Sequence, residues 1–250
     1  RLLDATLTVD ERRHVLDLIQ KRVHDRIPVP YLTKTAWYAG LPFHVDARVL
    51  IPRSPIFELI EREFDPWFET PIDRSIRFLD LCTGSGCLGI ITALTFPEST
   101  GVLADLESDA CQVARENVDF HQVCDRLEVI QSDGFDSLSK DTYDLIICNP
   151  PYVDAEDMAT LPPEFRKEPA VALASGNDGL ALVRRLLGQA AEWLTGDGIM
   201  ILEVGNTWGL LDREITSRTG QSVQWCEFEF GGRGVCVLSK RELNTLSSAF

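Results

Sequence analysis

The chain has 250 residues and a formal net charge of −15, with 44% hydrophobic and 25% charged residues. Its length fits one large domain, or one domain with a small additional segment, and its composition is that of a soluble globular protein. The negative charge argues against general nucleic-acid binding, which normally needs a basic surface, and favours encounter with a basic partner. An acidic balance also serves solubility alone, so both interpretations stand.

No apolar run reaches the roughly 18 residues of a membrane-spanning helix, and no signal-peptide pattern is present. Because the first residue is Arg1 rather than Met, we expect further residues before it. The seven cysteines are odd in number, include no Cys-x-x-Cys pair and lie mostly in apolar stretches. We therefore expect a cytoplasmic protein without a disulfide framework or a metal site.

The first predicted element is a helix over residues 1 to about 25. Thr8 can cap it, and Glu11, three residues later, completes a capping box. Its apolar face is formed by Val15, Leu16, Leu18 and Ile19. The leading segment, from residue 1 to about residue 70, is too small for a large core of its own, so we expect it to pack on the rest of the chain.

A β-hairpin is predicted next, with strands around residues 35–38 and 43–45 on either side of Gly40. We expect Trp37 and Tyr38 to be core aromatics of this hairpin.

An extended run over residues 49–53 and a helix over residues 55–68 follow, up to a linker near residues 69–71. We therefore divide the chain into residues 1–70 and residues 71–250.

From Ser75 onward, apolar strand-like runs alternate with helical stretches. The strand-like runs are residues 77–82, 101–105, 127–131, 143–148 and 199–204, and the helical stretches are residues 87–96, 109–121 and 178–194. This alternation predicts an α/β fold with a mostly parallel sheet that is covered on both faces.

Near the C-terminus, a helix over residues 208–218 leads to two strand-like runs, 223–230 and 235–239. These runs are joined too tightly for a parallel crossover, so we predict that they pair antiparallel. The stretch 153–176 is irregular and rich in proline. Its length predicts a functional loop, and the alternative is merely a long connection.

The most informative motif is Asn149-Pro150-Pro151-Tyr152, directly after the predicted strand 143–148. Proline has no backbone N–H, so the strand ends there. This leaves the Asn149 carboxamide and the Asn149 and Pro150 carbonyls at the end of the sheet where α/β folds bind ligands. These acceptors suit a planar –NH2 group, with the Tyr152 ring available to cover its face. An ordinary proline-rich turn is the alternative.

A second motif is the glycine-rich loop Thr83-Gly84-Ser85-Gly86, which follows the first strand of the sheet and leads into a helix. Combined with Asp80 at the strand end, Asp105 about twenty residues on and Asp133 after the third strand, it indicates a nucleoside-containing cofactor, whose ribose hydroxyls Asp105 can bind. Capping or turn roles are the alternatives for Asp105 and Asp133. The predicted cofactor-binding residues are Asp80, Cys82, Thr83, Gly84, Ser85, Gly86, Asp105, Asp133, Gly134 and Asn149. A slot lined by hydrogen-bond acceptors, as the Asn149-Pro150-Pro151-Tyr152 motif would form, has no use in hydride transfer. We therefore favour S-adenosylmethionine over a nicotinamide as the cofactor.

These motifs resemble those of the class I S-adenosylmethionine-dependent methyltransferases, and more closely the protein-(glutamine-N5) methyltransferases that act on release factors and ribosomal proteins. The resemblance runs from about residue 28 to 240. Within the family, Pro52-Arg53-Ser54-Pro55-Ile56 is similar to the branch that modifies a large-subunit ribosomal protein (number three). The release-factor branch usually has an acidic residue and a Thr shortly after Pro-Arg. The family's bulky residue after Ser-Asp is here Gly134.

The resemblance implies a class I methyltransferase (Rossmann-like) fold. Its mostly parallel seven-stranded sheet has an antiparallel last strand, with a small N-terminal helical segment and β-hairpin added. It implies transfer of a methyl group from S-adenosylmethionine to the N5 nitrogen of a glutamine in a basic protein, with S-adenosylhomocysteine as product. Residues 1–70, together with the loop 153–176, would then recognise the protein substrate, and no direct DNA binding is expected.

The proposed catalytic residues are Asn149, Pro150 and Tyr152, and Pro151 joins them in binding the substrate. The Asn149 carboxamide and the Pro150 carbonyl would hold the amide, and no general base is required. Arg53 either reaches the cofactor carboxylate or forms a surface ion pair. Glu168 and Asp178 are expected to brace the 153–176 loop.

Four alternative functions are a release-factor glutamine methyltransferase, a DNA adenine-N6 methyltransferase acting on a flipped base, a non-enzymatic scaffold and a nicotinamide oxidoreductase.

Overall fold

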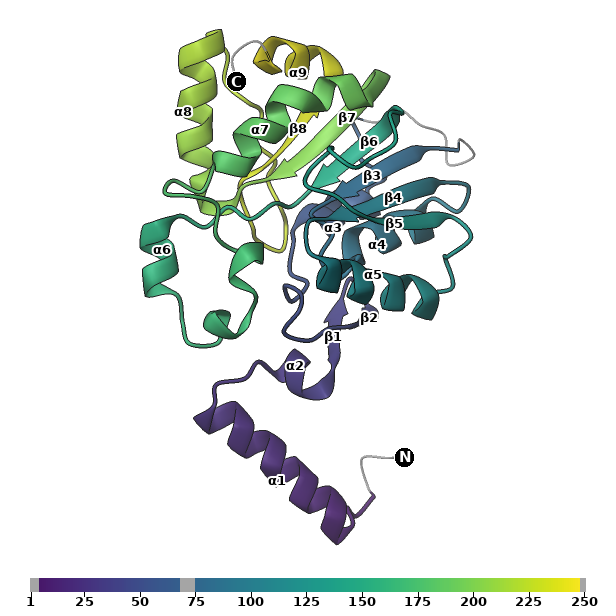
Figure 1. Ribbon diagram of the computed structural model, residues 1–250, viewed down its shortest axis with the longest axis vertical. Helices are drawn as coiled ribbons and strands as arrows, with labels where there is room; N and C mark the ends of the chain where they lie inside the picture. Colours follow the sequence, from purple (N-terminus) through teal and green to yellow (C-terminus); the bar gives the residue numbers. More distant parts are fainter. Residues whose placement is uncertain (1–4, 68–74, 248–250) are drawn as a thin grey trace.

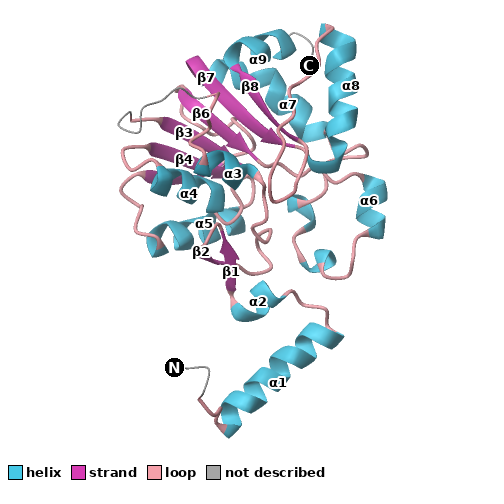
Figure 2. Cartoon of the chain, turned by 180° about the vertical axis from the view of Figure 1, so that it is seen from behind, coloured by secondary structure: helices cyan, strands magenta, loops and turns pink. Residues whose placement is uncertain are grey.

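The computed structural model describes residues 5–67 and 75–247, so the predicted boundary between residues 70 and 71 lies outside the described residues. A single mixed sheet forms the centre of the chain, in the order β5-β4-β3-β6-β7-β8 (Figures 1 and 2). The strands are β3 (Arg77–Leu81), β4 (Thr100–Asp105), β5 (Leu127–Gln131), β6 (Tyr143–Cys148), β7 (Leu194–Glu203) and β8 (Val235–Ser239). The first five run parallel and β8 runs antiparallel to β7, which confirms the predicted fold class.

Helices cover both faces of the sheet, because its central strands are apolar on both sides. On β6, Leu145 and Ile147 pack into one hydrophobic cluster, whereas Ile146 and Cys148 pack into the other. The first cluster includes side chains of α3 (Ile56–Glu61), α4 (Cys87–Thr95) and α5 (Ser108–Phe120), and the second includes side chains of α7 (Ala181–Gln189), α8 (Trp208–Thr219) and α9 (Lys240–Ser247).

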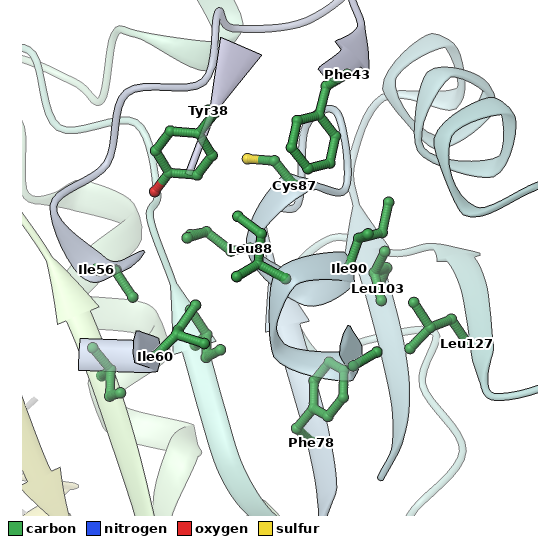
Figure 3. Packing of buried hydrophobic residues seen from close by; sticks show 14 of the residues in the cluster. Tyr38, Phe43, Ile56, Ile60, Phe78, Cys87, Leu88, Ile90, Leu103 and Leu127 are labelled. Carbon is green, nitrogen blue, oxygen red and sulfur yellow. The ribbon is translucent and has the colours of Figure 1, made fainter. Parts of the chain in front are cut away.

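The predicted hairpin is confirmed and consists of β1 (Thr35–Tyr38) and β2 (Leu41–His44). Its Tyr38 and Phe43 are buried and face Cys87 and Leu88 of α4 (Figure 3). The prediction that Trp37 is a core aromatic is wrong, since 73% of its surface is exposed. Successive side chains of a strand point to opposite faces, so burial of Tyr38 turns Trp37 outward.

The N-terminal helix α1 (Val9–His24) begins with the predicted capping box between Thr8 and Glu11. It projects from the body of the molecule, and none of its side chains is buried (Figure 1). The expectation that the leading segment, residues 1–70, packs on the rest of the chain is confirmed for the hairpin and α3, whose side chains join the first cluster, and is wrong for α1. Its link to the body includes an ion pair of 2.9 Å between Arg22 and Glu164. After α1, the short helix α2 (Val29–Thr33) leads into the hairpin.

The sheet has six strands in the part of the chain that the structure describes, rather than the predicted seven. Residues 223–230 form only an isolated bridge between Trp225 and Cys236. Side chains outside the segment take donors at both of its ends: Asp212 accepts the Val223 N–H at 3.1 Å, and the buried Glu58 carboxylate accepts the backbone N–H groups of Glu229 at 2.9 Å and Phe230 at 3.2 Å. These donors are then not available to a strand ladder.

The stretch 153–176 is more regular than predicted. It contains α6 (Ala155–Thr160) and two short 3-10 turns, η1 (Phe165–Lys167) and η2 (Ala170–Ala172), and a single parallel bridge joins Val153 to Ala174. Two further 3-10 turns, η3 (Ala190–Trp193) and η4 (Gly205–Thr207), flank β7. Among the described residues, no helix is long and apolar enough to cross a membrane.

Candidate functional site

The Asn149-Pro150-Pro151-Tyr152 motif lies at the carboxyl end of the central strand β6. The last residue of this strand, Cys148, pairs with Leu81 of β3 on one side and Leu202 of β7 on the other. The prolines end the ladder, so Asn149 emerges between the ends of two neighbouring strands. The strand order thus places this residue at the edge of the sheet where α/β folds bind their ligands.

Two cavities meet at Asn149. The larger, of about 440 Å³, extends along the glycine-rich loop and the ends of β4 and β5. The smaller, of about 130 Å³, lies between the motif and the 153–176 loop. Leu50, Asn149 and Ala172 line both cavities. A molecule in the larger cavity and a side chain in the smaller one would therefore meet beside Leu50, Asn149 and Ala172.

The acceptor groups of the motif are uncommitted. Within residues 5–67 and 75–247, the Asn149 carboxamide makes no hydrogen bond, and no N–H or O–H group donates to the Pro150 carbonyl. Polar groups at the wall of a cavity are normally satisfied by a partner or by water. These two acceptors are therefore available to a donor that enters the smaller cavity.

Tyr152 is held on three sides. Its hydroxyl donates to Glu203 at 2.9 Å, and its ring lies against Gly205, where an added Cβ would be 2.4 Å from Cε2. An added Cβ at Gly179 would lie 2.3 Å from the Tyr152 carbonyl oxygen. The position of the ring thus depends on glycine at 205, and the position of the Tyr152 backbone on glycine at 179.

The glycine-rich loop is braced by Asp80 from beneath. One Asp80 oxygen accepts the Thr83 hydroxyl at 2.6 Å and the Gly89 backbone N–H at 2.9 Å. The loop turns through positive φ at Gly84 (+56°) and Gly86 (+81°), which glycine adopts without strain. Asp80 thereby fixes the conformation of the loop rather than lining the cavity.

Asp80 also makes stability depend on pH. Burial raises its pKa to about 7, although the hydrogen bonds from Thr83 and Gly89 oppose the shift. Since the unfolded pKa is about 3.9, the stabilising contribution of Asp80 is complete below about pH 4 and is lost as the pH rises through about 7.

Asp80→Asn, which keeps the shape and does not titrate, is expected to flatten this dependence. The free energy of unfolding is measured by urea titration at about pH 5 and at about pH 8. Its decrease between these two pH values should be smaller in the variant than in the wild type. Equal losses in the two proteins would contradict the assignment.

The predicted cofactor residues fall into two groups. Those that line the larger cavity are Cys82, Gly84, Asp105, Asp133, Gly134 and Asn149. Those that shape the loop behind it are Asp80, Thr83, Ser85 and Gly86. Of the predicted substrate residues, Asn149, Pro150 and Tyr152 line the smaller cavity, whereas Pro151 lines the larger one.

Two carboxylates lie along the larger cavity. Asp105 accepts the backbone N–H groups of Gly84 at 2.9 Å and Glu107 at 3.0 Å, and burial raises its pKa. Each oxygen has a further lone pair for a ligand hydroxyl. Asp133 is paired with Arg185, whose hydrogen bonds lower its pKa. Arg185 also lies 3.4 Å from an added Cβ at Gly134, so a long side chain of α7 takes space that a bulky residue there would fill.

Arg53 does not line the larger cavity but the smaller one. Its Nη1 donates to both oxygens of Glu168, at 2.8 and 2.9 Å, and its guanidinium lies 4.8 Å from the centre of the Phe165 ring. The buried Glu168 carboxylate also accepts the Ile51 N–H at 3.0 Å. Of the two alternatives for Arg53, the structure shows an ion pair, but with a buried carboxylate rather than one at the surface, and the role of Glu168 as a brace of the loop is confirmed. Asp178 braces the end of the loop through an ion pair with Arg184 at 2.7 Å.

Three residues of the site were not predicted from the sequence: Glu203, Leu50 and Gly205. Glu203 ends the apolar strand β7, Leu50 lies in a loop distant in sequence, and Gly205 follows two residues after Glu203. The one local signal was a charged residue at the end of an apolar run, a position at which α/β folds place functional side chains. Within the described ranges, no group of three or more His, Cys, Asp or Glu residues could hold a metal ion.

A Rossmann-like sheet with an antiparallel last strand, a glycine-rich loop beside an acidic strand end and an Asn-Pro-Pro-Tyr motif define a methyltransferase. Residues 68–178 match the family described as Methyltransferase small domain. The chain is 42% identical over 249 residues to the ribosomal protein uL3 glutamine methyltransferase of Francisella tularensis, with coverage of 100% of this chain and 78% of that protein. It is 44% identical over 245 residues to the protein of the same name from Bordetella pertussis, with coverage of 97% and 80%. The chain belongs to the family of ribosomal protein uL3 glutamine methyltransferases.

Solved structures show the same fold at low identity. The catalytic domain of hMettl16 in complex with MAT2A 3'UTR hairpin 6 has a TM-score of 0.61 and 17% identity, and the match covers 93% of this chain and 82% of that one. A methyltransferase from Pyrococcus furiosus has a TM-score of 0.56 and 18% identity, with coverage of 93% and 99%. These likenesses concern the fold alone.

Proposed function

We propose that this chain transfers the methyl group of S-adenosylmethionine to the side-chain amide nitrogen of a glutamine in ribosomal protein uL3. The observation that carries the proposal is the position of Asn149, which lies in the wall shared by the two cavities with its carboxamide unbonded. The names of the relatives from Francisella tularensis and Bordetella pertussis support the substrate.

The larger cavity fits the cofactor. Its volume of about 440 Å³ lies within the range of about 300–1,000 Å³ that is typical of small-molecule sites. Asp105 offers free lone pairs to ribose hydroxyls, and the loop at Cys82 and Gly84 allows a close approach of backbone. Asp133 and Leu106 line the cavity near the ends of β5 and β4, where the adenine ring of the cofactor would lie. The bound cofactor would supply an electrophilic methyl group.

Asn149 and Pro150 would hold the glutamine side chain in the smaller cavity. A primary amide has two N–H groups in its plane, and the carboxamide oxygen of Asn149 and the carbonyl oxygen of Pro150 would accept one each. This fixes the plane of the amide, so that the face of its nitrogen turns toward the larger cavity. Positioning of this kind contributes up to about 7–11 kcal/mol to lowering a barrier.

The same two acceptors would also stabilise the transition state. The amide nitrogen is a poor nucleophile, and it becomes positive as its bond to the methyl carbon forms. Its protons then become strongly acidic, so the hydrogen bonds to Asn149 and Pro150 strengthen during the reaction. The chain needs no general base in this scheme, because the methylated amide nitrogen is strongly acidic and can lose its proton directly to water.

The protein substrate would contact residues 1–70 and the loop 153–176. Leu50 and Arg53 from the first segment and Leu161 and Phe165 from the loop line the smaller cavity, which supports this assignment. The net charge of −15 favours encounter with a basic ribosomal protein. Seven free cysteines support a reaction in the reducing cytoplasm.

The proposal is tested with purified chain, S-adenosylmethionine and one of three acceptors: protein uL3, a release factor or duplex DNA. We expect a single increment of about 14 daltons on one glutamine of uL3, located by tandem mass spectrometry, and none on the other acceptors. Modification of the release factor alone would assign the chain to the other branch. Modification of adenine, or of no acceptor, would reject the proposal.

A further inference from the structure

Glu203 lies at the base of the smaller cavity and is 4% exposed. Its Oε1 accepts the Tyr152 hydroxyl at 2.9 Å, and its Oε2 accepts the Ser54 hydroxyl at 2.5 Å. Burial raises the pKa of Glu203, while these hydrogen bonds and the charge of Arg53 lower it. Each oxygen of the carboxylate therefore has its own hydroxyl donor, from a different part of the chain.

The two arms of this network lead to different places. Ser54 belongs to the junction after the hairpin, where its carbonyl accepts the Tyr38 hydroxyl at 2.6 Å and its own hydroxyl accepts the Ile56 N–H at 3.1 Å. Tyr152 belongs to the Asn-Pro-Pro-Tyr motif and lines the smaller cavity with Glu203. One arm therefore joins structural elements, and the other reaches the place where the substrate amide would lie.

An ionised carboxylate accepts hydrogen bonds and donates none. A phenol hydroxyl has one proton, and in this structure the proton of Tyr152 is directed to Glu203. Tyr152 can then offer only lone pairs to a group that enters the smaller cavity. Together with the Asn149 carboxamide oxygen and the Pro150 carbonyl, Tyr152 then gives this side of the cavity three acceptors, while the guanidinium of Arg53, which also lines the cavity, is paired with Glu168.

We propose that Glu203 is a positioning residue that acts through Tyr152. It holds the ring beside Asn149 and keeps the hydroxyl proton out of the smaller cavity, so that the cavity prefers the amide of glutamine to the carboxylate of glutamate. This inference rests on the proposed glutamine substrate. A glutamate side chain has no donor for these lone pairs, and its carboxylate would be repelled by the carboxylate of Glu203.

The test compares two versions of uL3: the natural protein, and one in which the methylated glutamine is replaced by glutamate. Affinities are measured in the presence of S-adenosylhomocysteine, and kcat is measured with the natural protein. In Glu203→Gln, the new amide can donate to the Tyr152 oxygen and release the hydroxyl proton toward the cavity. We expect the ratio of the two affinities, glutamine version over glutamate version, to fall roughly tenfold. This is the size of effect expected when one hydrogen bond to a charged group is changed. We also expect kcat to fall about tenfold, because a Tyr152 proton directed into the cavity would compete with the substrate amide for the acceptors of Asn149 and Pro150.

If Glu203 had a merely structural role, Glu203→Gln would weaken the binding of both versions of uL3 alike and leave the ratio of their affinities unchanged. That result would overturn the inference. Ser54→Ala is the matched control, since it removes the other hydroxyl from the same carboxylate. We expect it to lower the Tm while kcat and the ratio stay within about threefold of wild type.

If Glu203→Gln does not fold, the test uses Tyr152→Phe instead and compares it with the same control, Ser54→Ala. The inference requires the preference for glutamine over glutamate to fall at least about threefold for Tyr152→Phe and not for Ser54→Ala, and an unchanged preference in Tyr152→Phe would overturn it. The proposed function fails separately, when wild-type chain does not methylate natural uL3.

Discussion

Asn149→Ala is expected to lower kcat for glutamine methylation by about 100- to 1,000-fold, the usual cost of removing a group that stabilises developing charge. The substitution removes the carboxamide oxygen that would accept one of the two substrate N–H groups, and the Pro150 carbonyl alone cannot fix the amide plane. Cofactor affinity should change little, because the larger cavity keeps Cys82, Gly84 and Asp105. Single-turnover kinetics and calorimetric titration with S-adenosylmethionine measure the two quantities.

Asn244→Ala is a suitable control, since this residue is exposed on α9, away from both cavities. It should retain wild-type kcat. An Asn149→Ala variant that keeps more than about a tenth of wild-type kcat would contradict the mechanism.

Gly205→Ala is expected to reduce kcat about a hundredfold, although Gly205 contacts neither proposed ligand. The added Cβ would lie 2.4 Å from the Tyr152 ring, and the ring cannot retreat without losing its hydrogen bond to Glu203. Gly205 also has a φ of +48°, so the substitution adds backbone strain of about 1–2 kcal/mol.

Gly220→Ala separates the clash from the strain. Gly220 ends α8 at a φ of +73°, and an added Cβ there has no atom within 4 Å. We expect both variants to lose about 1–2 kcal/mol of stability from the backbone, and only Gly205→Ala to lose activity. Equal kcat values in two folded variants would show that the position of Tyr152 does not limit the reaction.

The sheet and the motif at its centre could be predicted because their signals are local. Apolar runs mark β3 to β7, and consecutive prolines after Cys148 mark the end of a strand. The orientation of Trp37 and Tyr38 was also within reach, because adjacent residues in a strand cannot share one face. The prediction treated both as core and so ignored this alternation.

The remaining features depend on partners that are distant in sequence. Glu203 is 149 positions from Ser54 and 51 from Tyr152, so no local pattern announces their hydrogen bonds. The segment 223–230 has the composition of a strand, and the backbone N–H groups of its last two residues donate to Glu58, 171 positions away from Glu229. In such cases tertiary contacts decide the structure, and they override strand propensity.

The paired acceptors at Asn149 and Pro150 have a further consequence for the product. An unmodified amide brings two N–H groups, whereas a monomethylated amide keeps one. For a second round, the first methyl would have to lie against one of these oxygens, where a lone pair would face carbon and lose its hydrogen bond. We therefore expect the reaction to stop at monomethylglutamine, and the modified side chain to dissociate more readily than its precursor.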